Sequence, residues 1–133
     1  LNWQRIEEDA PAPSAVGCVH VHTPQQSWAL AWNEGLRTDG AVDAEVLQTH
    51  VFKPLFGIED ARTDARLSYA PGTLDSAALK AKYGAQPEQA LFELPAVTPE
   101  QLMQTADQGG FLPPKSTWIE PKLRSGLFIH EIQ

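Results

Sequence analysis

Two runs of residues with a period of two lie close together near the start of the chain, and they constrain the fold more than any other feature. In residues 17–22, valine and histidine occupy alternate positions. After them, Trp28, Leu30 and Trp32 occupy every second position. This period is typical of strands with one buried face, and residues 23–26 contain a proline that favours a turn between the runs. The sequence therefore predicts a β-hairpin whose tryptophan and leucine stripe faces the core.

Thr98 provides the clearest helix signal. Pro99 stands at the first helical position, Gln101 completes a capping box, and Gly109 follows the last turn. These residues predict a helix over residues 98–108.

Weaker signals predict two more helices and three more strands. Asp43 favours the start of a helix that continues to about Lys53, because apolar residues follow it at spacings of three and four, and Pro54 and Gly57 are expected to end it. Asp75 favours the start of another helix, which Gly84 closes. The expected strands cover residues 67–70, 90–94 and 127–132.

This order of elements predicts an α+β fold with an N-terminal β-hairpin. We expect a mixed β-sheet with helices packed mainly on one face, in two layers. The 133 residues suffice for one core. Residues 7–14 combine acids with two prolines, so we expect a linker or extended lead-in over residues 1–14 and a single domain over residues 15–133.

The overall charge argues against a nucleic-acid partner. The chain has 17 acidic and 10 basic residues and a net charge of -7, which repels polyanions. No apolar run approaches the roughly 18 to 20 residues of a membrane-spanning helix, so no membrane partner is expected. The single cysteine, Cys18, rules out an intramolecular disulfide and favours a cytoplasmic location.

A proline-bounded cationic segment, residues 113–126, stands out from this acidic background. Its cations are Lys115, Lys122 and Arg124, and the hydroxyls of Ser116 and Thr117 lie beside the first of them. Such a set of donors favours a phosphate or carboxylate ligand. A solvated turn whose charges pair with their neighbours is equally consistent with the pattern.

The same segment begins with a near match to a phosphate-binding P-loop. Residues 109–116 differ from that motif at one position, where Pro114 replaces the second glycine. Pro113 and Pro114 lack the N–H groups that a P-loop directs at phosphates, and their fixed φ excludes the required turn. A helix is also expected before the motif, where a P-loop needs a strand. The sequence therefore argues against a P-loop.

Acids and arginines interleave in residues 59–66. Arg62 is a candidate for bidentate contact with a ligand carboxylate, and Asp64 is a candidate to face the cations of residues 115–124. Pairing of the arginines with Asp60 and Asp64 inside the loop is the favoured alternative, because the opposite charges are already close in the sequence.

His20 and His22 share one face of the expected hairpin, a spacing that can present two imidazoles to a metal ion. His50, His130 or an aspartate could complete such a site, but the sequence places none of them near the pair, so we predict no metal site. Cys18 lies among small and apolar residues without an obvious base, and we expect it to be a packed thiol.

Four motifs together resemble one prokaryotic family. They are Pro-Leu-Phe-Gly-Ile-Glu-Asp-Ala-Arg-Thr-Asp at residues 54–64, Ala-Asp at 106–107, Pro-Pro-Lys-Ser-Thr-Trp at 113–118 and Glu-Pro-Lys-Leu-Arg-Ser-Gly-Leu at 120–127. Over residues 42–132 the chain resembles the C-terminal part of the family called domain of unknown function 1015. The hairpin resembles that family only loosely.

The resemblance implies that the chain is the C-terminal portion of a longer protein. The family's upstream part is similar to ParB and sulfiredoxin-like proteins, among which ATP-using free-serine kinases occur. The implied partners are that N-terminal half and a small anionic ligand. The resemblance implies that the full-length protein is a small-molecule phosphotransferase that uses ATP. For this fragment alone we expect neither a cofactor nor catalysis. The alternative is a structural or interaction domain with no ligand or catalytic activity of its own.

Overall fold

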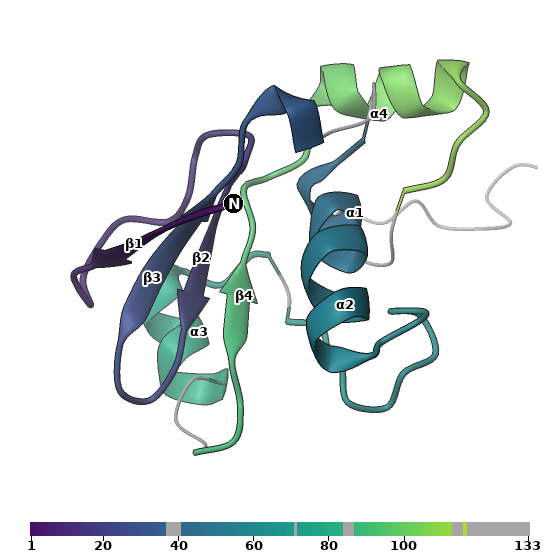
Figure 1. The fold of residues 1–133 in the computed structure, drawn as a ribbon. Coiled ribbons are helices and arrows are strands. Elements are labelled where there is room, and N and C mark those ends of the chain that lie inside the picture. The colour runs from purple at the N-terminus through teal and green to yellow at the C-terminus, as the bar shows by residue number, and fades with distance from the viewer. Residues whose placement is uncertain (37–40, 71, 84–86, 113–115, 117–133) are drawn as a thin grey trace, which may run out of the picture.

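A four-stranded sheet with the strand order β1-β3-β2-β4 organises the fold (Figure 1). The computed structural model describes residues 1–36, 41–70, 72–83, 87–112 and 116. All three pairs of neighbouring strands are antiparallel, so within the described residues the sheet is antiparallel and not, as expected, mixed. The strands are β1 (Asn2–Ile6), β2 (Cys18–His22), β3 (Ser27–Ala31) and β4 (Leu91–Glu93).

β2 and β3 form the predicted hairpin, with Val19 opposite Leu30 and Val21 opposite Trp28. Thr23 closes the turn: its N–H donates to the carbonyl of Gln26 at 3.0 Å, and its hydroxyl donates to the same oxygen at 3.0 Å. Of the predicted stripe, Leu30 and Trp32 are buried in the core cluster as expected, whereas Trp28 is only partly buried. The hairpin, the strand expected at residues 90–94 and the α+β class are confirmed.

One face of the sheet packs against a continuous helical run. The run consists of α1 (Asp43–Leu47), a π-helical turn η2 (Gln48–Phe52) and α2 (Lys53–Phe56). Val46, Leu47 and Val51 join the sheet residues in the main core cluster. Phe52 meets Phe92 of β4 edge to face, with ring centroids 5.1 Å apart. This packing makes the face that carries Val19 and Val21 the hydrophobic core of the domain.

The helical run differs from its prediction at both ends. Val42 is the N-cap, and Asp43 lies one position inside the helix, where its carboxylate accepts a 3.0 Å hydrogen bond from the Gly17 N–H. The run also continues past Pro54. Proline has no N–H for a normal helical bond, and the preceding π-turn, in which Lys53 N–H donates to Gln48 O, gives the backbone the wider path that admits it. Gly57 ends the run with φ of 63°.

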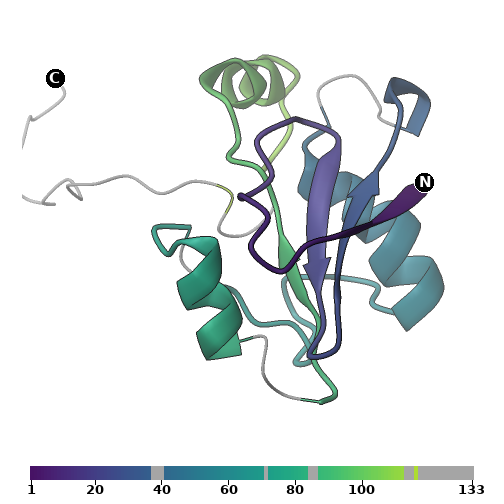
Figure 2. The same cartoon turned by 90° about the vertical axis from the view of Figure 1, so that its left-hand side faces the viewer.

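The opposite face of the sheet carries His20, His22 and Glu93, and α3 (Ser76–Tyr83) lies on that side (Figure 2). Asp75 is the predicted cap, since its carboxylate accepts from the Ala78 N–H at 2.7 Å. α3 contacts the sheet through Ser76, whose hydroxyl donates to Glu93. The helices were expected mainly on one face, and α3 adds helical cover to the second face.

α4 (Pro99–Asp107) matches its prediction closely. The Thr98 hydroxyl accepts from the Gln101 N–H at 3.2 Å, and the Gln101 side chain accepts from the Thr98 N–H at 3.0 Å, which completes the capping box. Gly109 follows with φ of 67°. The predicted helix is therefore confirmed.

Three further sequence predictions have different outcomes. Residues 2–6, placed within the extended lead-in, form β1 and pair with β3. Residues 67–70 are not a strand, because Leu67 N–H closes a turn onto Asp64 O and the Tyr69 hydroxyl donates to Ala61 O at 2.7 Å, which folds this stretch back on its own loop. Gly84 and the strand expected at residues 127–132 lie outside the described residues. None of the described helices is long and apolar enough to span a membrane.

Asp43 links the start of the hairpin to the start of the helical run, so its loss should weaken the core. In Asp43→Ala the buried Gly17 N–H loses its acceptor, and we expect the free energy of unfolding in urea to fall by about 1–3 kcal/mol. Asp43→Asn is the matched control, because an amide oxygen can still accept, and it should lose less. Equal losses in the two variants would contradict the importance of this bond.

Candidate functional site

Seven residues were predicted to contact a ligand, and the structure describes three of them: Arg62, Asp64 and Ser116. Lys115, Thr117, Lys122 and Arg124 lie outside the described residues.

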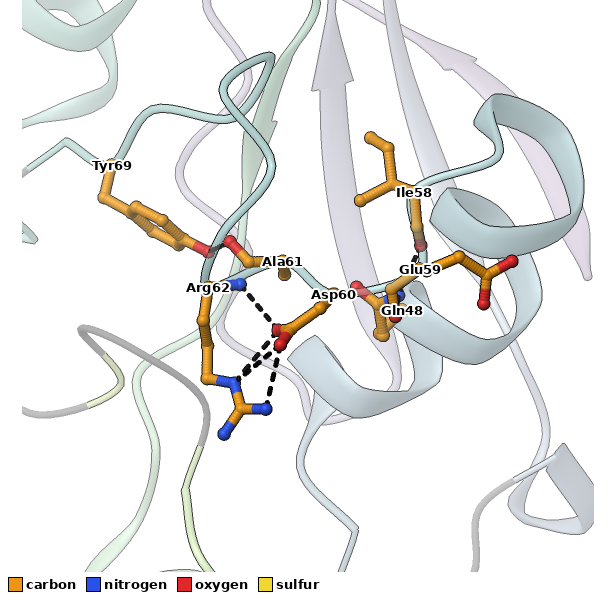
Figure 3. Close-up of polar contacts among 7 residues, drawn as sticks. All are labelled: Gln48, Ile58, Glu59, Asp60, Ala61, Arg62 and Tyr69. Carbon is orange, nitrogen blue, oxygen red and sulfur yellow. Dashed lines mark hydrogen bonds and ion pairs between the residues drawn. The ribbon is translucent and has the colours of Figure 1, made fainter.

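Residues 59–66, here termed the Asp–Arg loop, contain two Asp-x-Arg units with the same geometry. In the first, Asp60 accepts from the backbone N–H and the Nε of Arg62 at 2.9 Å each, and from Nη2 at 2.9 Å (Figure 3). In the second, Asp64 accepts from the backbone N–H and Nε of Arg66 at 2.9 Å each, and from Nη2 at 2.6 Å. The internal pairing that the sequence favoured is therefore present in both units.

These hydrogen bonds favour the charged form of each carboxylate. The Arg66 side chain, followed by the Arg66 backbone N–H, lowers the pKa of Asp64 to about 2. The corresponding groups of Arg62 lower the pKa of Asp60. Both carboxylates are ionised across the physiological range, so each arginine carries a fixed counter-charge.

The second unit has a structural role. Beyond Asp64, Arg66 donates from Nη1 to Phe56 O at 2.8 Å and from Nη2 to Gly57 O at 3.4 Å. These carbonyls lie at the C-terminus of α2, where a helix has unpaired acceptors and a partial negative charge. Asp64 therefore orients a helix-capping arginine. Its predicted part in facing the cations of residues 115–124 stays a prediction.

The first unit does not cap a helix. Within the described residues, Arg62 forms its hydrogen bonds with Asp60 alone, and its side chain is 72% exposed. Its guanidinium is turned toward the Asp60 carboxylate (Figure 3). Arg62 and Ser116 both border a broad, open concavity that spans much of the described surface and is also lined by acids such as Glu59, Asp60 and Glu93, whereas Asp64 does not border it. Because the concavity is so extensive, this shared border does not place Arg62 beside Ser116.

The two arginines should differ in their effect on stability. Arg66→Ala removes a cap from α2 and should lower the melting temperature measurably, whereas Arg62→Ala breaks only an exposed pair and should leave it nearly unchanged. Arg66→Lys tests geometry, because one ammonium cannot reproduce the fork that spans Asp64 and the two carbonyls. Equal melting temperatures for the two alanine variants would contradict the capping role.

A second polar cluster, which we term the His–Glu cluster, lies on the sheet face under α3. It consists of His20, His22 and Glu93, which are 8%, 2% and 8% exposed. His22 Nε2 is 3.2 Å from Glu93 Oε2, and His22 Nδ1 is 2.8 Å from Ser27 Oγ. The sequence showed the two histidines but not Glu93, because the pairing of β2 with β4 that sets His20 opposite Glu93 joins residues far apart in the chain.

Burial controls the protonation of this cluster. Desolvation lowers the pKa of both His20 and His22, and Lys80 lowers both further. Glu93 acts in the opposite direction on each, with a hydrogen bond in the case of His22, and does not reverse the shift. Neutral imidazoles are therefore favoured, and neutral imidazole is the form that can accept a hydrogen bond or ligate a metal ion.

The buried histidines should make stability depend on pH. Because their folded pKa values lie below the ordinary value of about 6.5, the unfolded chain binds protons that the folded chain does not, so stability should fall as the pH falls below about 6.5. His20→Gln removes one such group and should reduce the slope by up to about 1.4 kcal/mol per pH unit. Urea unfolding at several pH values, in buffer with a chelator, measures both slopes. An unchanged slope in the variant would contradict the lowered pKa of His20.

Cys18 shows no sign of activation. It is partly buried, and burial followed by the charge of Asp43 raises the pKa of its thiol. A thiol with a raised pKa is a poor nucleophile at neutral pH. The expected packed thiol is consistent with this environment.

Searches against family models, curated proteins and solved structures found no significant match to this chain. The resemblance to domain of unknown function 1015 therefore stays a prediction, based on the quoted motifs. The function must be argued from the residues themselves.

Proposed function

We propose that this domain helps to bind a small anionic ligand, a phosphate or a carboxylate, as the C-terminal part of a longer protein. Arg62 and Ser116 contribute from the described part of the chain. The remaining contacts come from the cationic segment, through Lys115, Thr117, Lys122 and Arg124. Asp64 contributes by facing the cations of residues 115–124.

One observation carries this proposal: the Arg62 side chain is largely exposed and, within the described residues, its guanidinium pairs with Asp60 alone. Asp60 holds the guanidinium through Nε and Nη2, which leaves Nη1 directed away from the pair. A guanidinium already fixed in orientation loses less conformational entropy when it binds an oxyanion than a flexible one does. Asp60 also offsets part of its charge, so a second cation is needed for firm binding. The cationic segment supplies such cations.

The alternative is a structural or interaction domain with no ligand or activity of its own. The Asp64–Arg66 unit favours it, because all of its contacts serve the loop and the end of α2. Under this alternative the concavity of the domain is a packing surface for the upstream part of the protein. The two readings differ in whether loss of Arg62 changes ligand affinity.

The same proposal extends to the activity and location of the full-length protein. The domain has no turnover by itself, and the N-terminal half of the full-length protein supplies the catalytic groups and the ATP site of a small-molecule phosphotransferase. We place that protein in the cytoplasm, where a lone thiol remains reduced.

Calorimetric titration with inorganic phosphate, phosphoserine and ATP tests the proposal, first on this chain and then on the full-length protein. Arg62→Ala should weaken anion binding about tenfold or more, as expected for loss of a charge-assisted hydrogen bond. Lys115→Ala should do the same. Lys82→Ala is the matched control: it removes one positive charge from α3, where Lys82 lies over the Tyr83 ring outside the concavity, and it should leave the affinity unchanged.

The alternative predicts a different result from the same variants. If Arg62→Ala and Lys115→Ala retain the affinity of the parent protein, or if Lys82→Ala weakens binding equally, the anion site is wrong. A fall in melting temperature on Lys115→Ala with unchanged affinity would support the structural role.

A further inference from the structure

The His–Glu cluster has the composition of a metal site. His20, His22 and Glu93 each offer one ligand atom, and these three atoms all lie within 4.8 Å of one another. All three side chains are more than nine-tenths buried. Paired antiparallel strands hold them, since His20 lies directly opposite Glu93 in the register of β2 and β4. Two imidazoles and a carboxylate are a common protein ligand set for zinc and other first-row transition metals.

His20 supplies an independent indication that the cluster has a missing partner. Its Nδ1 is buried and has no hydrogen-bond partner among the described residues. A buried polar atom without a partner costs free energy, commonly about 1–3 kcal/mol, and such atoms are rare in native proteins. His20 also lies beside His22, with ring centroids 6.0 Å apart. A group that binds to His20 Nδ1 would remove this free-energy cost.

The contacts around the cluster resemble the outer shell of a metal site. Ser27 Oγ is 2.8 Å from His22 Nδ1, and the Ser76 hydroxyl donates to Glu93 Oε1 at 2.5 Å. Partners of this kind fix the orientation of metal-ligating imidazoles and carboxylates. When His22 Nδ1–H donates to Ser27, the lone pair of Nε2 faces Glu93 Oε2. Two acceptors in this position require a proton or a cation between them, whereas in the other tautomer Nε2–H donates to Glu93 and Nδ1 accepts from the Ser27 hydroxyl.

The spacing of the two best-placed atoms suits tetrahedral zinc. Ligands at about 2.0–2.1 Å from a tetrahedral ion lie about 3.3 Å apart. His22 Nε2 and Glu93 Oε2 are 3.2 Å apart. Small side-chain movements bring the third atom within range, since it lies within 4.8 Å of both.

We propose that His20, His22 and Glu93 bind a divalent transition-metal ion, with zinc the best fit. The three residues leave one tetrahedral position for water or a small ligand. A shallow pocket lined by residues 10–15, Cys18 and His20 adjoins the cluster on this face. Lys80 is the nearby cation that opposes metal binding, and its ammonium is engaged by the carbonyl of Glu8.

Zinc titration of the chelator-treated chain tests the site. We expect one equivalent to bind and to raise the melting temperature, because the ion binds the folded state. Cobalt(II) should bind with the visible absorption of a tetrahedral site. Magnesium should not compete, since it prefers oxygen ligands in octahedral geometry.

Variants assign the ligands. His20→Ala, His22→Ala and Glu93→Gln should each weaken zinc binding more than about tenfold, and Ser76→Ala should weaken it about tenfold through the orientation of Glu93. His50→Ala, a histidine on η2 outside the cluster, is the control and should bind as the parent does. If His22→Ala does not fold, Glu93→Gln and Ser76→Ala retain the test, because both preserve most of the cluster's packing.

Three results would overturn the inference: no stoichiometric zinc binding by the parent chain, parent affinity in both His20→Ala and Glu93→Gln, or equal loss in His50→Ala. The zinc test and the anion test are distinguishable, although His22 and Glu93 border the same concavity as Arg62. Arg62→Ala should leave zinc affinity unchanged, and chelation of zinc should leave the effect of Arg62→Ala on phosphate binding intact.

Discussion

The rest of the structure depends on the burial of β2 on both of its faces. Val19 and Val21 project toward α1 and the core cluster, while His20 and His22 project toward the side of α3. A strand enclosed in this way must satisfy apolar packing on one side and hydrogen bonding on the other, because a buried polar group without a partner is costly. The hydrophobic core and the His–Glu cluster are thus two consequences of one alternating sequence.

The sequence predicted those elements whose signals are local. Thr98 and Gln101 lie three residues apart, and the turn at Thr23 joins two neighbouring strands, so their geometry follows from adjacent residues. Contacts between distant segments could not be predicted in this way. Asp43 was expected to cap its own helix and instead accepts from Gly17, and Glu93 meets His22 across 71 positions. The part of the candidate site that depends on tertiary pairing was therefore missed.

The Asp–Arg loop shows how identical local chemistry acquires different roles. Asp60–Arg62 and Asp64–Arg66 have the same spacing and nearly the same hydrogen bonds. Only the second reaches the carbonyls of Phe56 and Gly57, because its guanidinium lies at the end of α2. The sequence correctly predicted the pairing but not this division, since the division depends on which backbone lies within reach.

β4 is only three residues long, and it borders β2 with a side chain on each face. Phe92 contacts Phe52 on the core side, and Glu93 joins the histidines and Ser76 on the other. Any opening of this short strand separates both sets of contacts in one event. The contacts on the two faces of the sheet are consequently coupled in their local unfolding. A ligand that holds Glu93 would therefore also slow amide hydrogen exchange around Phe52 and Phe92 on the other face.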